Sequence, residues 1–131
     1  MPRKSDATRA GTKQVSSRET RLTLRLDFDD EGRLGPGKVR LLELLDEKGS
    51  ISAAGRAMDM SYRRAWQLID ELNRTFTDEL VTTQQGGARG GGAVLTQTGR
   101  DIINAYRAIE KKTLKAAAVE IALIERALAK P

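Results

Sequence analysis

Residues 50–95 restrict the possible folds of this chain more than any other segment of the sequence. Two short stretches of helical pattern flank Asp59, and aspartate tolerates the left-handed backbone that a sharp turn between helices requires. Ser50 or Ser52 can cap the first helix, and Ser61 the second, by accepting hydrogen bonds from free backbone N–H groups. The segment therefore predicts a helix-turn-helix.

The second of these helices has a clear amphipathic stripe. Its apolar residues recur at positions i, i+3, i+4, i+7 and i+11, and they are Ala65, Leu68, Ile69, Leu72 and Phe76. This spacing puts them on one helical face, which we expect to be buried against a core. The first helix is expected to be short, over about residues 53–58.

A glycine-rich loop follows between two short predicted strands, residues 80–84 and 93–95. Five of the seven residues in 86–92 are glycine, which adopts positive φ without steric cost. No Lys-Ser/Thr pair follows the glycines and they lead into a strand, so neither a P-loop nor a dinucleotide fingerprint fits. The pattern predicts a wing, with Arg89 and Gly90 at a tip that enters the minor groove of DNA. The alternative is a loop without a partner.

Further elements on both sides complete a mainly α fold with a small β-hairpin. Residues 22–28 alternate between apolar and polar side chains, which predicts a strand with one buried face. Clustered leucines predict a helix over about residues 38–48, and Gly49 is suited to end it. Thr96 or Thr98 can cap a last helix.

The predicted last helix is too long for a small domain to cover. About 30 residues in one helix span roughly 45 Å. Its apolar stripe comprises Ile102, Tyr106, Ile109, Ala117, Ile121, Ile124 and Leu128. We expect residues 113–131 to pair with a second copy of the chain, which makes a homodimer. The alternative is a helix that folds back on its own domain after a break near residues 111–113.

Composition excludes several classes of function. The chain has no Cys and no His, which excludes disulfides, thiolate nucleophiles, the usual Cys/His zinc sites and imidazole acid–base chemistry. The carboxylates at 27 and 29–31 fit a solvated turn, so we expect no enzymatic activity, and no cofactor or metal. No apolar run approaches the roughly 20 residues of a membrane span. The charged N-terminus lacks an apolar signal core, so we expect a cytoplasmic protein.

The formal net charge of +5 is concentrated at the N-terminus. Residues 1–21 contain six basic and two acidic residues, which accounts for +4 and leaves +1 for the rest. Such a tail can raise nonspecific affinity for phosphates, and the alternative is a solvated leader without a partner. We expect a disordered basic tail over residues 1–20, a winged helix-turn-helix domain over residues 21–112 and dimerisation through residues 113–131.

A helix-turn-helix reads DNA with the first turn of its second helix. The polar residues there are Ser61, Tyr62, Arg63, Arg64 and Gln67. Arginine can form two hydrogen bonds with guanine and glutamine two with adenine, while hydroxyls can donate to phosphates. Two arginines near a helix N-terminus oppose the macrodipole, which favours contact with a ligand over an ordinary solvent-exposed helix end. We expect the neighbouring Trp66 to pack against the preceding helices instead of contacting DNA.

These segments resemble the DNA-binding domain of the ModE family of molybdate-responsive transcriptional regulators, which has a LysR-like winged helix. The resemblance covers about residues 22–112. It rests on the predicted first helix, Gly-Ser-Ile-Ser-Ala-Ala at 49–54, Ser-Tyr-Arg-Arg-Ala-Trp at 61–66, the segment 86–96 with its final Leu-Thr, and Gly99. It implies a homodimer that binds a palindromic operator through the helix after Ser61 and through the wing. It also implies dimer contacts from the first strand and the last helix.

ModE regulators continue into paired oxyanion-binding domains that sense molybdate, whereas this chain stops at Pro131. We therefore expect no molybdate site within it, either because it is a stand-alone member or because the sensor was removed. The main expectation is a bacterial regulator that binds double-stranded DNA. The alternative is a protein- or RNA-interaction module with the same fold, which the near-neutral charge of residues 22–131 keeps open.

Overall fold

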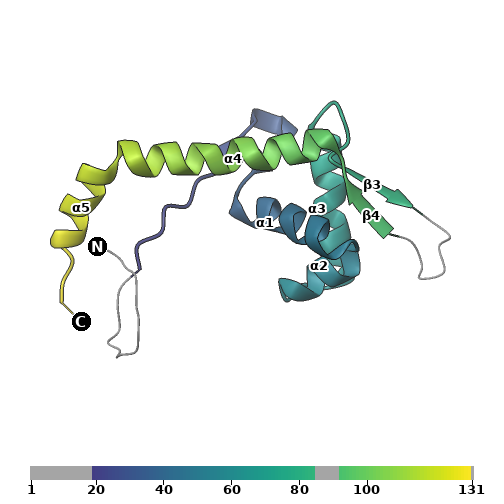
Figure 1. Ribbon diagram of the computed structural model, residues 1–131, viewed down its shortest axis with the longest axis horizontal. Coiled ribbons are helices and arrows are strands. Elements are labelled where there is room, and N and C mark those ends of the chain that lie inside the picture. The colour runs from purple at the N-terminus through teal and green to yellow at the C-terminus, as the bar shows by residue number, and fades with distance from the viewer. Residues whose placement is uncertain (1–18, 85–91, 131) are drawn as a thin grey trace.

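The computed structural model of the chain describes residues 19–84 and 92–130. Within these ranges it has the predicted mainly α fold with a two-stranded wing (Figure 1). The elements are β1 (Leu26–Asp27), the short 3₁₀ helix η2 (Asp29–Glu31), β2 (Arg33–Leu34), α1 (Pro36–Lys48), α2 (Ile51–Ala57), α3 (Tyr62–Thr75), β3 (Val81–Gln84), β4 (Gly92–Leu95), α4 (Gln97–Ala116) and α5 (Ala118–Arg126). Helix α4 crosses α1 and extends well beyond it, away from the wing (Figure 1).

The predicted helix caps are present in the structure. Ser50 Oγ accepts a hydrogen bond from the Ala53 N–H at 3.0 Å, so α2 begins at Ile51, two residues earlier than expected. Asp59 has a φ of 56°, which confirms the left-handed turn between α2 and α3. Short-range chemistry thus determines where these two helices begin and how they are joined.

The core lies between α1, α3 and the start of α4. Helix α1 contributes Leu41, Leu42 and Leu45, which are fully buried, and α3 contributes its predicted stripe. The expectation that the stripe continues to Phe76 is wrong, because α3 ends at Thr75. The Phe76 ring instead packs edge-on against Phe28, with 5.9 Å between ring centroids. The chain turns away from the helix at this point, so Phe76 covers the rim of the core.

The strand expected over residues 22–28 is mostly absent from the described structure. Two of these residues form β1, which pairs antiparallel with β2, while residues 19–25 are neither helix nor strand. The strand cannot extend back into residues 22–25, because its partner β2 ends at Leu34 and the chain enters α1 at Pro36. The alternation of apolar and polar residues still corresponds to one buried side of the chain, because Leu22 and Leu24 are half-buried and their neighbours are exposed.

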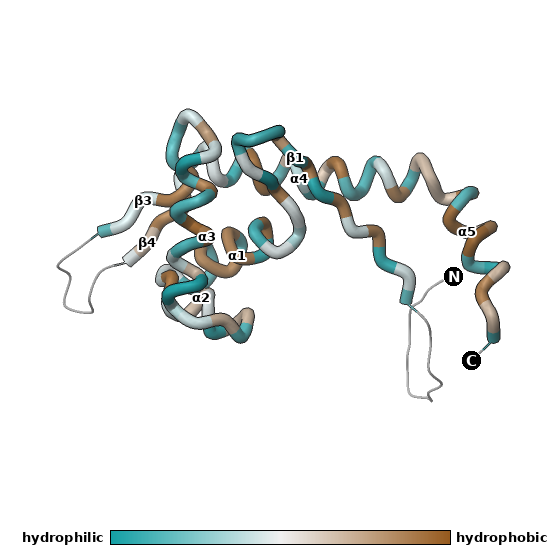
Figure 2. Tube along the Cα trace, turned by 180° about the vertical axis from the view of Figure 1, so that it is seen from behind, coloured by the Kyte–Doolittle hydropathy of each residue, from teal (hydrophilic) through white to brown (hydrophobic). Residues whose placement is uncertain are grey.

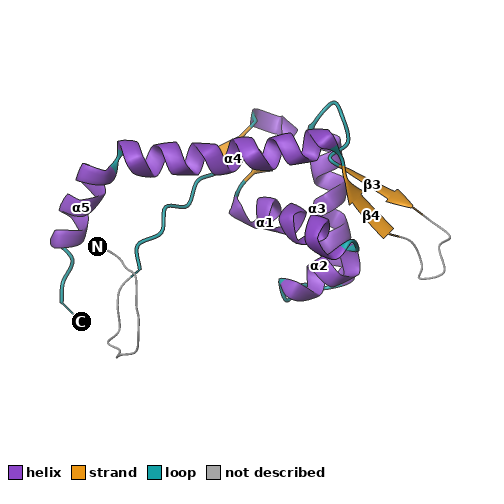
Figure 3. Ribbon diagram, viewed as in Figure 1, coloured by secondary structure: helices purple, strands orange, loops and turns teal. Residues whose placement is uncertain are grey.

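The expectation of one continuous last helix is also wrong. The helical backbone is interrupted at Ala117, where φ is −102° and ψ is 12°, and α5 is turned away from α4 (Figure 3). The alternative of a helix that folds back after a break predicted this break near residues 111–113. The structure has it a few residues later, at Ala117. The buried residues of α4 are Gly99, Ile103 and Tyr106, all in its first half. Past this point the helix has left the core, so little packing opposes a bend at a run of three alanines.

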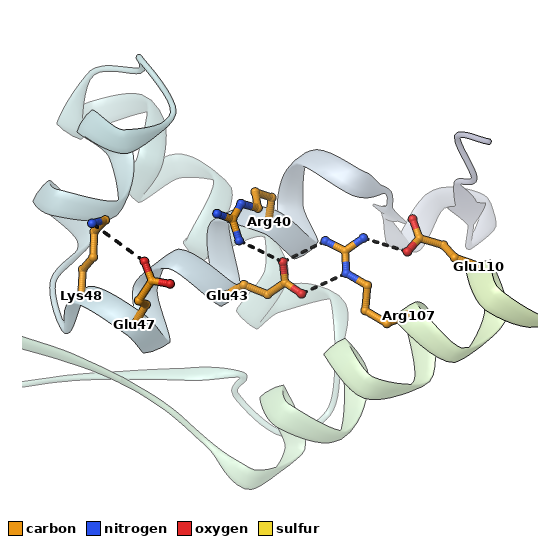
Figure 4. A network of polar contacts seen from close by, with 6 residues as sticks. All are labelled: Arg40, Glu43, Glu47, Lys48, Arg107 and Glu110. Atoms are coloured by element: carbon orange, nitrogen blue, oxygen red, sulfur yellow. Dashed lines mark hydrogen bonds and ion pairs between the residues drawn. The ribbon is translucent and has the colours of Figure 1, made fainter. Parts of the chain in front are cut away.

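A network of ion pairs holds α4 against α1 (Figure 4). The Arg107 guanidinium donates through Nε and Nη2 to both carboxylate oxygens of Glu43, at 2.9 and 2.8 Å, and through Nη1 to Glu110 at 2.7 Å. Arg40 reaches Glu43 from its own helix at 3.5 Å. The hydrogen bonds from Arg107 lower the pKa of Glu43 although partial burial opposes this shift. Glu43 is therefore ionised at neutral pH, and the two-pronged geometry sets the position of α4 on the domain.

Candidate nucleic-acid interface

The first turn of α3 is an exposed and polar surface. Ser61 Oγ accepts a hydrogen bond from the Arg64 N–H at 3.0 Å, which confirms Ser61 as the cap of the helix. Ala65 is fully buried directly behind this turn. The alternation of exposed and buried positions therefore points the side chains of Arg63, Arg64 and Gln67 away from the core.

The two arginines are not used by the fold itself. Among the described residues, neither Arg63 nor Arg64 has an ion-pair or side-chain hydrogen-bond partner, and the same holds for Gln67. Further along α3, Arg74 is paired with Asp70 at 3.1 Å. The unpaired positive charge on α3 is therefore concentrated at its N-terminal end, which is the end that enters a groove in helix-turn-helix proteins.

Tyr62 and Trp66 lie one turn apart on the flank of α3. The Tyr62 side chain is 55% exposed, whereas Trp66 is half-buried and packs against the core, as predicted. The Trp66 indole N–H donates a hydrogen bond to the Tyr62 hydroxyl. The sequence pattern did not reveal this pair, although its i, i+4 spacing on a helix permits it.

Helices α2 and α3 cross closely, and α2 carries a further exposed cation, Arg56. A Cβ on Gly55 would lie 3.0 Å from the Cβ of Ala65, so glycine permits the tight crossing. Arg56 on α2 is exposed and donates to Ser52 Oγ at 2.8 Å. Sequence reasoning missed Arg56; the signal that could have found it is a basic residue in the last turn of the first helix of a predicted helix-turn-helix. In such folds the first helix crosses the DNA backbone.

Asn73 attaches the wing to α3. Its side-chain Oδ1 accepts from the N–H groups of Leu80 and Val81 at 2.9 and 3.1 Å, and its Nδ2 donates to the Val81 carbonyl at 2.9 Å. Strands β3 and β4 then pair antiparallel, with Val81 opposite Leu95 and Gln84 opposite Gly92. Sequence reasoning also missed Asn73, a polar residue beside the buried stripe of α3. Its three hydrogen bonds fix the direction in which the wing leaves the domain.

The other end of the wing is joined to α4 by Thr96. This residue caps α4 by accepting from the Gly99 N–H at 3.0 Å, and its hydroxyl also lies 2.8 Å from the Glu79 carbonyl and 3.1 Å from that of Leu80. Thr96 is one of the two residues expected to form this cap. Strands β3 and β4 thus begin and end at fixed points, while the predicted tip residues Arg89 and Gly90 lie outside the described residues.

Two other kinds of feature, a metal-binding cluster and a membrane-spanning helix, are absent from the described residues. The acidic residues of η2 are exposed in a turn, as expected, and no group of three or more His, Cys, Asp or Glu in residues 19–84 and 92–130 is arranged to hold a metal ion. The helices in these ranges are also not long and apolar enough to cross a membrane.

Comparison with known proteins agrees with the geometry of the α2–α3 pair. Residues 37–100 match the family described as bacterial regulatory helix-turn-helix protein, lysR family. The chain is 41% identical over 85 residues to the molybdenum transport protein ModE of Azotobacter vinelandii, which covers 65% of this chain and 32% of that protein. It is 39% identical over 107 residues to the molybdenum-pterin-binding protein MopB of Rhodobacter capsulatus, covering 81% of this chain and 40% of that protein.

A third relative is the DNA-binding transcriptional dual regulator ModE of Escherichia coli K12, at 39% identity over 71 residues, or 54% of this chain and 27% of that protein. The chain thus spans between 27% and 40% of the length of these three relatives. The matches bear out the resemblance to a ModE-type DNA-binding domain. The absence of a molybdate site and the cytoplasmic location are not tested by them and stay predictions.

Proposed function

We propose that this chain binds a palindromic operator as a homodimer, because its residues 37–100 match the bacterial LysR-type helix-turn-helix family and because it is similar to ModE regulators. DNA binding in transcription regulation is the function that this family supports. The observation that carries the proposal is the pair Arg63 and Arg64, both exposed and without ion-pair partners in the described structure, at the start of a firmly capped helix.

In this proposal α3 lies in the major groove. Arg63 and Gln67 are one turn apart on the face opposite the buried stripe, and Arg64 lies at the side of that face; all three side chains reach base edges. The hydroxyls of Ser61 and Tyr62 donate to phosphates. The wing tip, with Arg89 and Gly90, contacts the adjacent minor groove.

A salt titration of DNA binding tests this proposal against the alternative of a protein- or RNA-interaction module. We expect a preferred sequence, selected from genomic fragments, to bind with a logarithmic salt slope of roughly −0.9 for each phosphate that the protein neutralises. Binding to an unrelated duplex of equal length serves as the control. Equal and weak binding to both duplexes, or tighter binding to RNA, would contradict the proposal.

The proposed dimer rests on apolar residues that the single chain leaves exposed. Leu114 is 45% exposed on α4, and on α5 Val119 is 76% and Leu123 60% exposed. Figure 2 shows this hydrophobic colouring on α5, at the end of the molecule opposite the wing. A second copy of the chain covers such a surface and supplies the second recognition helix that a palindrome requires.

Replacing Val119 and Leu123 with glutamate is expected to raise the dissociation constant of the dimer at least tenfold. The reason is that burying each apolar side chain contributes about 1.5–3 kcal/mol, which a charged side chain at the interface does not recover. Sedimentation velocity over a concentration series measures this change. The double variant with glutamine at Glu120 and Glu125 is the control on the same helix. A dimer of unchanged strength in the glutamate variant would rule out α5 as the interface.

A further inference from the structure

The hydrogen bond from Trp66 to Tyr62 has no evident need in folding. Tyr62 is 55% exposed, so water would satisfy its hydroxyl without help, and the Trp66 ring already packs against the core. The indole N–H nevertheless points out of the core to the phenol oxygen of Tyr62. The half-buried Trp66, which packs against the core, therefore holds the hydroxyl of the exposed Tyr62 in place.

The bond decides which hydrogen-bonding role Tyr62 can offer to a ligand. A phenol carries one proton and can also accept, whereas an indole N–H can only donate. While Tyr62 accepts from Trp66, the phenol proton is directed to another group. We propose that Trp66 is a positioning residue for DNA binding, which orients the Tyr62 hydroxyl as a donor to a phosphate oxygen of the bound DNA. This inference rests on the proposed function.

The place of Tyr62 on α3 favours phosphate over a base edge. Successive residues of a helix are about 100° apart, so Tyr62 and Trp66 lie about 40° from each other on one flank of α3. Arg63 and Gln67 occupy the neighbouring face, opposite the buried stripe. When the face with Arg63 and Gln67 points to the base edges at the bottom of the groove, the flank with Tyr62 and Trp66 points to the side of the groove. The phosphates of the DNA backbone lie along that side. Phosphate oxygens are acceptors, which matches a hydroxyl held as a donor.

A double-mutant cycle tests whether Trp66 acts through Tyr62. Trp66→Phe keeps an aromatic ring but removes the N–H, and Tyr62→Phe removes the hydroxyl. Because a hydrogen bond to a charged group is worth about 1.5–3 kcal/mol, Tyr62→Phe is expected to weaken operator binding about tenfold or more. Trp66→Phe is expected to weaken it about threefold to tenfold. The double variant should be no weaker than Tyr62→Phe alone. Additive losses, or no loss in Trp66→Phe, would overturn the inference.

Neutral methylphosphonate linkages, placed one at a time along the operator, identify the contacted group. The wild-type protein should lose affinity at one linkage in each half-site to which the Tyr62→Phe variant is insensitive. Equal sensitivity of both proteins at every linkage would exclude a phosphate as the partner of Tyr62. If the wild-type protein prefers no DNA sequence, the proposed function itself is wrong. If it binds an operator but its Tyr62→Phe variant shows the same sensitivity at every linkage, only the inference about Tyr62 and Trp66 is wrong.

Tryptophan emission gives a readout that a merely structural role would not change. Trp66 is the one tryptophan of the chain, so the tryptophan emission reports on the surroundings of this indole, which include its hydrogen bond to Tyr62. Operator binding should alter the emission of the wild-type protein and alter it much less in Tyr62→Phe, a variant at an exposed position. Identical changes in both proteins would count against the inference even if Trp66→Phe failed to fold. Urea unfolding of Trp66→Phe shows whether its packing is retained.

Discussion

Replacement of both Arg63 and Arg64 with alanine is expected to lower operator affinity between about thirtyfold and about twenty-thousandfold. Each lost base contact costs about 1–3 kcal/mol, and about 1.4 kcal/mol corresponds to a factor of ten. The fold should be unaffected, because both side chains are exposed and make no ion pair or side-chain hydrogen bond within the described residues. Fluorescence anisotropy with a labelled operator measures the affinity, and far-UV circular dichroism measures the helix content.

The matched control removes the same net charge elsewhere. Lys111 and Lys112 are neighbouring exposed cations on α4, and their double alanine variant changes the overall field of the protein by the same amount. It should lose little of the preference for operator over unrelated DNA. If both double variants lose affinity equally, the arginines act through general electrostatic attraction and the assignment of α3 as the recognition helix is wrong.

The largest effect on stability is expected from Tyr106→Ala. The Tyr106 ring is 1% exposed, and its hydroxyl donates to the Leu24 carbonyl at 2.7 Å, which ties the N-terminal segment to α4. Removing a large buried ring costs about 3–5 kcal/mol. This is a large part of the about 5–15 kcal/mol by which domains are stable. Urea unfolding at one fixed protein concentration measures the loss.

Tyr106→Phe separates the ring from the hydroxyl. It keeps the packing and removes one hydrogen bond, so the free energy of unfolding should fall by about 0.5–1.5 kcal/mol. A similar loss in the alanine and phenylalanine variants would mean that the ring contributes little and that the bond to Leu24 dominates. The expected order is wild type, then phenylalanine, then alanine.

The sequence was sufficient to predict those structural features that depend on interactions between residues close together in the chain. The caps at Ser61 and Thr96 and the left-handed turn at Asp59 were predicted, because each depends on one side chain and the backbone within three residues of it. The stripe of α3 was predicted from its period up to Leu72. These features together identify the helix-turn-helix and place Arg63 and Arg64 on its exposed end.

The remaining features depend on contacts between distant segments. Residues 22–25 alternate as a strand does, but no strand in the described structure pairs with them, and Leu24 contacts Tyr106 instead. The periodicity of the last helix could not show where its contact with the core ends, so the break at Ala117 was missed. The bonds from Asn73 to the wing likewise join residues that only the folded chain brings together.

The junction of wing and helix at Thr96 also limits how this sequence can vary during evolution. A Cβ at position 99 would lie 2.5 Å from the Leu80 carbonyl oxygen and 2.7 Å from Leu95 Cδ1. That carbonyl cannot easily yield, because the backbone N–H of Thr96 and its hydroxyl both bond to it. Any residue other than glycine at position 99 must therefore displace the point where the hairpin meets α4. A threonine followed three positions later by an invariant glycine is the expected signature of this junction in divergent relatives.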